Sequence, residues 1–103
     1  SIHANYFPSP RWSGAQTFYY EGSAESQHLA RTLQTELVRY LGPNNRLARP
    51  GDFRVLRDTT MPAAMVEVGF LSNPREAQLL SQESYQKQVA SAIFSGILRY
   101  YRE

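Results

Sequence analysis

The sequence predicts one α/β domain, in which a mixed sheet is flanked by helices. Short segments rich in β-branched and aromatic residues alternate with two long segments whose apolar residues recur at helical spacing. Glycine and proline mark the boundaries between these segments. At 103 residues and 42% hydrophobic composition, the chain is long enough to bury one modest core and too short for two domains.

Composition excludes several classes of protein. The net charge of +2 comes from basic residues spread along the chain, so we expect no nucleic acid partner. The absence of cysteine excludes disulfides and thiolate metal sites. No segment approaches the ~20 consecutive apolar residues that a membrane span needs, and residues 1–103 contain no charged-then-apolar stretch typical of a signal peptide.

The chain begins with a short apolar segment, residues 1–5, that we expect to form a strand. This beginning has neither an initiator methionine nor a polar lead-in, so we expect further sequence upstream. Residues 6–14 then contain two prolines and a glycine, which predict a loop. The loop carries the aromatic residues Tyr6, Phe7 and Trp12, which either fold back onto the core or face a substrate.

The next two elements have clear boundaries. Residues 15–20 are rich in aromatic residues and predict a short strand. Ser23 is suited to cap a helix, and leucines then recur every four residues as far as Leu41, which predicts an amphipathic helix. Gly42 followed by Pro43 ends it.

The second half predicts a loop, two strands and two helices. Residues 44–52 should form a surface loop, followed by a short strand at residues 54–57. The uncharged run at residues 63–71 predicts a buried strand. Asn73, Pro74 at the first helical position and Glu76 predict a short helix, and helical spacing from Tyr85 to Tyr100 predicts a long last helix beginning near residues 81–84.

Glu67 is the strongest indication of function, because it is the single charged residue within the apolar run at 63–71. A carboxylate in such a strand is costly unless an ion, a substrate or a proton accompanies it. The alternative is a buried salt bridge to Arg54 or Arg57 of a neighbouring strand.

His3 is a second candidate, at the end of the first apolar segment. A lone histidine in this position is more often a hydrogen-bonded core residue than a metal ligand. Turn residues follow both His3 and Glu67, which places both near the carboxyl ends of strands, where α/β sheets bind ligands. His28 falls at a polar position of the first helix and should be surface. Together, His3 and Glu67 suggest a metal site with a nearby general base.

Three segments carry a resemblance to a known family. They are residues 1–5 (SIHAN), 14–19 (GAQTFY) and 66–74 (VEVGFLSNP). In this order they resemble the motifs of the zinc-dependent N-acetylmuramoyl-L-alanine amidases, the amidase type 3 family. The resemblance covers essentially the whole chain, and residues 14–20 and 75–101 are most similar to the germination-specific amidases of the spore cortex.

The resemblance implies roles for individual residues. The second zinc histidine of the family falls on His3, and its catalytic glutamate falls on Glu67. The other histidine and the glutamate ligand belong to segments that precede SIHAN in family members, so residues 1–103 would be the carboxyl-terminal portion of one catalytic domain. Asn5 either touches substrate or orients a ligand, or it has an ordinary turn role.

The activity implied is hydrolysis of the amide between N-acetylmuramic acid and L-alanine of the peptidoglycan stem peptide, outside the cytoplasm, at the cell wall or secreted. Zinc would be the cofactor. The alternative is a non-catalytic wall-binding or interaction fragment that lacks a complete zinc site. Half a sheet leaves an unpaired edge, so we also expect an upstream fragment or a second chain to complete the domain.

Overall fold

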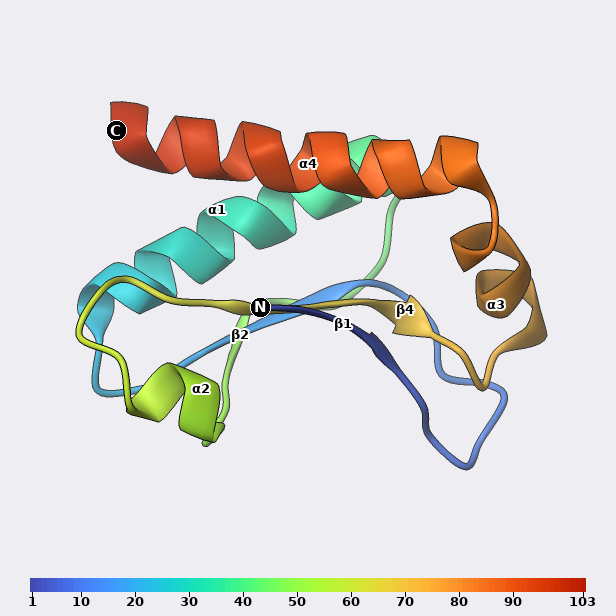
Figure 1. Cartoon of the computed structure of the whole chain (residues 1–103), viewed down its shortest axis with the longest axis horizontal. Coiled ribbons are helices and arrows are strands. Elements are labelled where there is room, and N and C mark those ends of the chain that lie inside the picture. Colours follow the sequence, from blue (N-terminus) through green and yellow to red (C-terminus); the bar gives the residue numbers. More distant parts are fainter.

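The computed structural model describes all 103 residues and contains a four-stranded mixed sheet, which confirms the predicted architecture (Figure 1). The strands are β1 (Ile2–Asn5), β2 (Gln16–Tyr19), β3 (Arg49–Pro50) and β4 (Met65–Phe70). Their order across the sheet is β1-β4-β2-β3, with β4 parallel to β1 and antiparallel to β2. The short β3 pairs in parallel with β2 and lies within the segment predicted as loop.

Four helices complete the chain. They are α1 (Ala24–Leu41), α2 (Arg54–Arg57), α3 (Pro74–Leu80) and α4 (Glu83–Arg102). The predicted caps are confirmed, since the Ser23 hydroxyl accepts from the Ser26 amide and the Asn73 side chain accepts from two amides of the first turn of α3. Gly42, at φ 108°, ends α1. None of these helices combines the length and apolar content that crossing a lipid bilayer requires.

The prediction of a strand at residues 54–57 is wrong, because these residues form the single turn α2. Of the residues in the turn, Leu56 alone is buried, so the segment lacks the repeated inward positions of a strand. The turn also places Arg54 within 3.3 Å of the Asp58 carboxylate, and Phe53, which precedes it, packs edge-on against Phe18 of β2.

The core lies between the sheet and the two long helices, which both cover the same face (Figure 1). Its largest contributions come from α1, β4 and α4: Ala30, Leu33, Leu37, Val66, Val68, Val89 and Ala92. Because side chains alternate along a strand, burial of Val66 and Val68 on this face directs Glu67 to the opposite face. Only loops and the short α2 lie on that opposite side (Figure 1).

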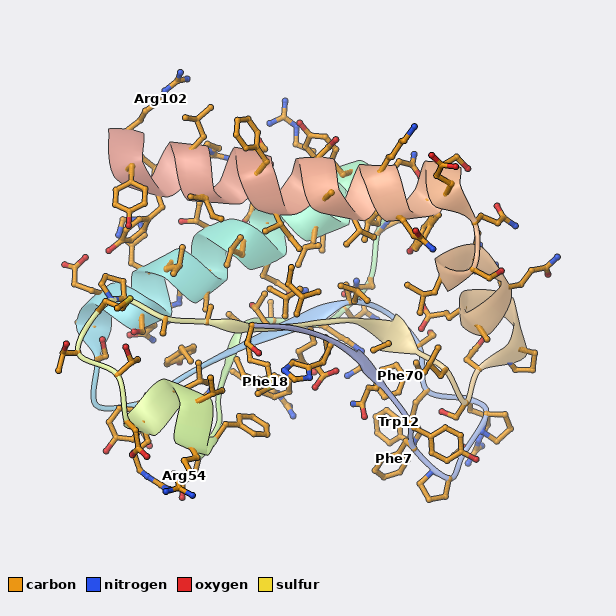
Figure 2. All side chains as sticks on the ribbon, viewed as in Figure 1. Phe7, Trp12, Phe18, Arg54, Phe70 and Arg102 are labelled. Carbon is orange, nitrogen blue, oxygen red and sulfur yellow. The ribbon has the colours of Figure 1, made fainter.

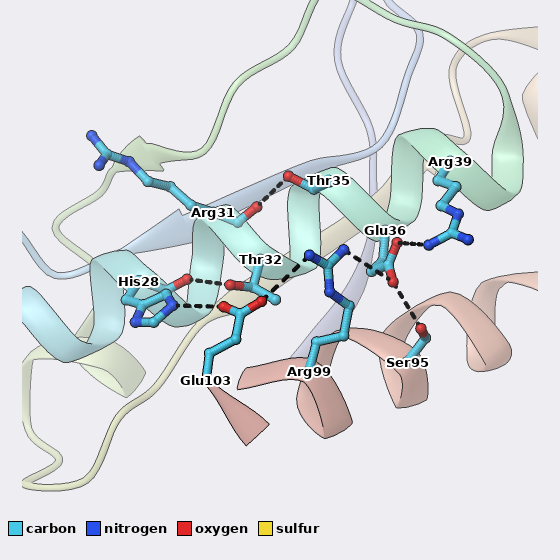
Figure 3. A network of polar contacts seen from close by, with 9 residues as sticks. All are labelled: His28, Arg31, Thr32, Thr35, Glu36, Arg39, Ser95, Arg99 and Glu103. Carbon is cyan, nitrogen blue, oxygen red and sulfur yellow. Dashed lines mark hydrogen bonds and ion pairs between the residues drawn. The ribbon is translucent and has the colours of Figure 1, made fainter. Parts of the chain in front are cut away.

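A buried carboxylate joins α1 to α4 (Figure 3). Glu36 is fully buried and accepts a 2.8 Å hydrogen bond from the Ser95 hydroxyl, while guanidinium nitrogens of Arg99 and Arg39 lie 3.5 and 3.6 Å from its oxygens. Burial by itself raises the pKa of Glu36, but the hydrogen bond and the two positive charges outweigh it and lower the pKa. The carboxylate is therefore held in its charged form between the helices.

Candidate active site

Glu67 and His3 lie side by side on adjacent parallel strands. The register of β1 and β4 pairs His3 with Glu67, and Ile2 with Val66. Partners in register share one face of a sheet, so both side chains belong to the face opposite the long helices. The structure thus brings together the two residues that the sequence singles out.

The carboxylate of Glu67 has no protein partner. Its Oε2 atom is buried and accepts no hydrogen bond. Burial raises the pKa of Glu67, and the nearby His3 acts in the opposite direction. A buried polar atom without a partner costs about 1–3 kcal/mol, so this carboxylate is available to a proton, a cation or a substrate.

The predicted alternative, a salt bridge from Glu67 to Arg54 or Arg57, is wrong. Arg54 pairs with Asp58 at 3.3 Å, and Arg57 pairs with Asp52 at 2.9 Å. Because residues 54–57 form a helical turn rather than a strand beside β4, these guanidiniums engage acidic residues of their own loop.

The two histidines differ in setting. His3 is exposed, and its Nε2 lies 2.6 Å from the Ser1 hydroxyl. His28 is exposed on α1 and lies 3.2 Å from a carboxylate oxygen of Glu103, at the end of α4 (Figure 3). The prediction of a surface position for His28 is confirmed, and His3 is the histidine beside Glu67.

The residues present offer part of a metal site. No group of three or more histidine, cysteine, aspartate or glutamate side chains is placed to hold an ion. Catalytic zinc takes three protein ligands. The exposed imidazole of His3, beside an unpaired carboxylate oxygen of Glu67, fits as one portion of such a site, and zinc stays a prediction.

The turn residues after His3 and Glu67 predict positions near the carboxyl ends of their strands. In the structure both residues lie further inside the strands. Glu67 is the third of the six residues of β4, and His3 is the second of the four residues of β1. Strands β1 and β4 stay paired beyond His3 and Glu67, because a register irregularity between His3 and Asn5 brings Asn5 opposite Phe70. Asn5 accepts from the Leu71 amide through its carbonyl, and its side chain makes no hydrogen bond, so both predicted roles stay open.

The aromatic loop at residues 6–14 folds back onto the sheet in part, and a role in facing substrate stays a prediction. Trp12 packs on Phe70 of β4 with ring centroids 6.4 Å apart, and Phe7 contacts Trp12 edge-on (Figure 2). Yet Trp12 remains 47% exposed and Tyr6 74% exposed. The loop is therefore anchored to the end of β4 and exposes aromatic side chains next to the face of the sheet opposite α1 and α4, which we call the open face.

Glu76 is a site residue that sequence reasoning missed. We expected it to support the start of α3, but its carboxylate accepts from the amides of Gly14, at 2.8 Å, and Phe70, at 2.9 Å. It thereby ties the aromatic loop to the end of β4. Its position three residues after the Asn73 cap was a signal for a helix start, and no pattern in the sequence indicates contact with Gly14 across 62 positions.

A family model described as N-acetylmuramoyl-L-alanine amidase matches residues 1–99. The chain belongs to this amidase family. It is 50% identical over 104 residues to the germination-specific N-acetylmuramoyl-L-alanine amidase of Bacillus subtilis (strain 168), covering 100% of this chain and 44% of that protein.

Solved amidase structures share the fold. The CwlD amidase from Clostridioides difficile, in complex with the GerS lipoprotein, matches with a TM-score of 0.96 and 41% identity, over 99% of this chain and 53% of that one. The catalytic domain of CwlV from Bacillus (Paenibacillus) polymyxa matches with a TM-score of 0.90 and 37% identity, over 99% of this chain and 56% of that one. This amidase chain thus spans about half the length of each of these three relatives.

Proposed function

We propose that the chain is the carboxyl-terminal part of the catalytic domain of a peptidoglycan amidase. The reaction is hydrolysis of the amide between the lactyl group of N-acetylmuramic acid and L-alanine of the stem peptide. The observation that carries this proposal is the half-buried carboxylate of Glu67, which has an unpaired oxygen and stands beside His3 on the open face. The family match and the names of the relatives agree with it.

Glu67 acts as the general base. Burial in an apolar strand raises its pKa, while His3 and a zinc ion bound beside it would lower the pKa. Glu67 takes a proton from the attacking water and delivers it to the nitrogen of the leaving L-alanine, so that an amine rather than an amide anion departs. Asn5, at the end of β1, contacts the substrate.

His3 would hold zinc through its imidazole, together with ligands from outside residues 1–103. When bound, zinc is a Lewis acid that polarises the scissile carbonyl and favours ionisation of water. His3 and Glu67 are register partners on adjacent parallel strands and therefore lie close together. Glu67 would thus be within reach of a water beside a metal ion held by His3.

The rest of the domain covers the edge of the sheet at β1. An apolar groove of about 410 Å³ runs between this edge and the long helix α4. Its lining includes Ile2, Ala4, Val68, Leu80 and Ile93. An upstream part of the same domain, or a second chain, would bury this groove and pair with β1.

The relatives suggest where the protein works. The Bacillus subtilis relative is named as germination-specific, and the Clostridioides difficile relative was solved with a lipoprotein. We propose that this amidase acts outside the cytoplasm on cell-wall or spore-cortex peptidoglycan, and that a protein partner assembles with it.

Replacing Glu67 by glutamine in the full-length protein tests the proposal. Glutamine keeps the size of the side chain but accepts no proton, so we expect muropeptide release to fall by about 10²–10⁴-fold, the usual contribution of a general base. Zinc content, measured by elemental analysis, should stay unchanged. The matched control is Glu83→Gln, since that carboxylate is 81% exposed and pairs only with Lys87.

Retained activity in Glu67→Gln would remove this residue from the role of base. His3→Ala should lower the zinc content, and an unchanged content would remove His3 from the ligand set. A full-length protein that binds the wall but releases no stem peptide would favour the non-catalytic alternative.

A further inference from the structure

A strongly basic pocket of about 630 Å³ opens beside the face that carries Glu67. It is formed by the aromatic loop, β2 and the loop before β3. Its lining includes Arg11, Trp12, Gln16, Asn44, Arg46 and Arg49, and no aspartate or glutamate. We call it the arginine pocket.

Gln16 connects the arginine pocket to the candidate active site. In the antiparallel pairing of β2 with β4, Gln16 is the register partner of Glu67. Such partners lie about 4.5–5.5 Å apart at Cα and share a face of the sheet. Gln16 is 6% exposed, and its side chain is fixed by the Leu47 carbonyl at 2.7 Å and by Arg46 at 2.9 Å. The pocket therefore begins one strand away from the proposed base.

The inner guanidinium of the pocket is rigidly placed. Arg46 donates to the Ser13 carbonyl at 2.7 Å and lies over the rings of Trp12 and Phe70, 5.5 and 4.8 Å from their centroids. Burial lowers the pKa of Arg46, and nearby Glu76 acts against this. That carboxylate is already engaged by two backbone amides, so it does not occupy the pocket.

The outer two guanidiniums have no partner. Neither Arg11 nor Arg49 makes an ion pair or a side-chain hydrogen bond, and both are exposed. Three like charges around one hollow repel each other unless an anion enters it. Guanidinium groups pair with carboxylates through two parallel hydrogen bonds, which suits this pocket to a carboxylate ligand.

We propose that the arginine pocket binds a free carboxylate of the stem peptide, one or two residues beyond the amide cleaved at Glu67. This inference rests on the proposed function. Each peptide residue spans at most about 3.3–3.6 Å and neighbouring strands lie about 4.7–4.9 Å apart, so two residues cover the step from β4 to β2, where Gln16 lines the pocket. In peptidoglycan, the D-glutamyl residue after L-alanine is joined onward through its side chain, which leaves its α-carboxylate free unless it is amidated.

The test compares Arg11→Gln/Arg49→Gln with Lys87→Gln/Arg102→Gln in the full-length enzyme. Both pairs remove two exposed positive charges, but the control residues lie on α4, which contributes no residue to the pocket. The substrates are muropeptides with a free carboxylate, with an amide at the second residue, and with an amide at the third.

We expect the pocket variant to raise KM at least 10-fold for the acidic substrate and to leave kcat within about 2-fold. For one of the two amidated substrates, the amide replaces the carboxylate that the pocket binds, and the pocket variant should not raise its KM further. The position of the amide in that substrate identifies the stem-peptide residue that supplies the carboxylate. Equal changes for all three substrates, or the same change in the control variant, would overturn the proposal.

A binding measurement separates this inference from the catalytic one. Calorimetry with the product tripeptide L-alanyl-γ-D-glutamyl-diaminopimelate needs no turnover and can use Glu67→Gln as background. We expect at least 10-fold weaker binding when Arg11 and Arg49 are also replaced. If replacing Arg11 and Arg49 leaves binding unchanged, the proposal for the arginine pocket is overturned, whatever the activity of Glu67→Gln. If their replacement weakens binding but Glu67→Gln is active, only the role of Glu67 as general base is overturned.

Discussion

Glu76→Gln should loosen the aromatic loop from the sheet. In the structure one carboxylate accepts two backbone hydrogen bonds, from Gly14 at 2.8 Å and from Phe70 at 2.9 Å. Glutamine supplies one acceptor oxygen and one NH₂ group, so one of the two amides would face a donor. A hydrogen bond to a charged group contributes about 1.5–3 kcal/mol, and we expect the free energy of unfolding to fall by that amount.

Scanning calorimetry of the full-length protein measures the loss. For a domain of 150–250 residues, each kcal/mol shifts Tm by about 2–4 °C, so the expected decrease in Tm is about 3–12 °C. Hydrogen exchange gives the local readout, because the Gly14 amide should lose protection while amides in the middle of α1 keep theirs. The control is Glu83→Gln, at an exposed ion pair that contributes little.

The reasoning would be refuted by two results together. One is a Tm for Glu76→Gln equal to that of Glu83→Gln, and the other is unchanged exchange at Gly14. Both would mean that the two amide contacts contribute nothing, and that the aromatic loop is held by its other contacts, such as the packing of Trp12 on Phe70 and the hydrogen bond from Arg46 to the Ser13 carbonyl.

Two further predictions concern the contact between α1 and α4. Gly96→Ala should lower the free energy of unfolding by about 1–3 kcal/mol in denaturant titration, because the added Cβ would lie 2.7 Å from Leu33 Cδ2 and 3.2 Å from its Cα; a free energy of unfolding equal to that of wild type would contradict the close approach. The pKa of Glu36 is lowered by folding, so its contribution to stability is present above the unfolded pKa of about 4.3 and is lost as pH falls through the folded value. The stability difference between wild type and Glu36→Gln should therefore shrink below about pH 4, and a difference that is constant from pH 7 to pH 3 would exclude this contribution.

The predictable part of the fold came from local patterns. The cap at Ser23, the leucine spacing of α1 and the proline at the first position of α3 each act within a few residues, so sequence suffices to place them. The pairing of His3 with Glu67 was also foreseeable in outline, since both stand in apolar strands whose neighbours need burial. Zinc and the role of Asn5 remain predictions, because residues 1–103 place no group of three metal-binding side chains together and the side chain of Asn5 makes no hydrogen bond that would assign its role.

What escaped prediction depends on contacts between distant segments. Residues 54–57 form a helical turn that follows the contact of Phe53 with Phe18, some 35 positions earlier, and local β-propensity could not reveal such a contact. The arginine pocket likewise combines Arg11 of the aromatic loop with Arg46 and Arg49, which lie just before and at the start of β3 and in sequence look like scattered surface charge. A net charge of +2 spread along a chain can still converge in space once β2 and β3 pair.

The sheet itself explains why a costly carboxylate and a positive pocket occur together. Strand β4 has a valine on either side of Glu67 that the core requires, so any residue at position 67 must face the open side. That side is covered by loops, and the unpartnered arginines come from the aromatic loop before β2, which carries Arg11, and from β3, which begins with Arg49. Binding of a neutral glycan to this face would not require the positively charged pocket, and binding of an anionic peptide would not require Glu67. The two features serve one ligand when that ligand has a cleavable amide followed by a carboxylate, as the stem peptide of peptidoglycan does.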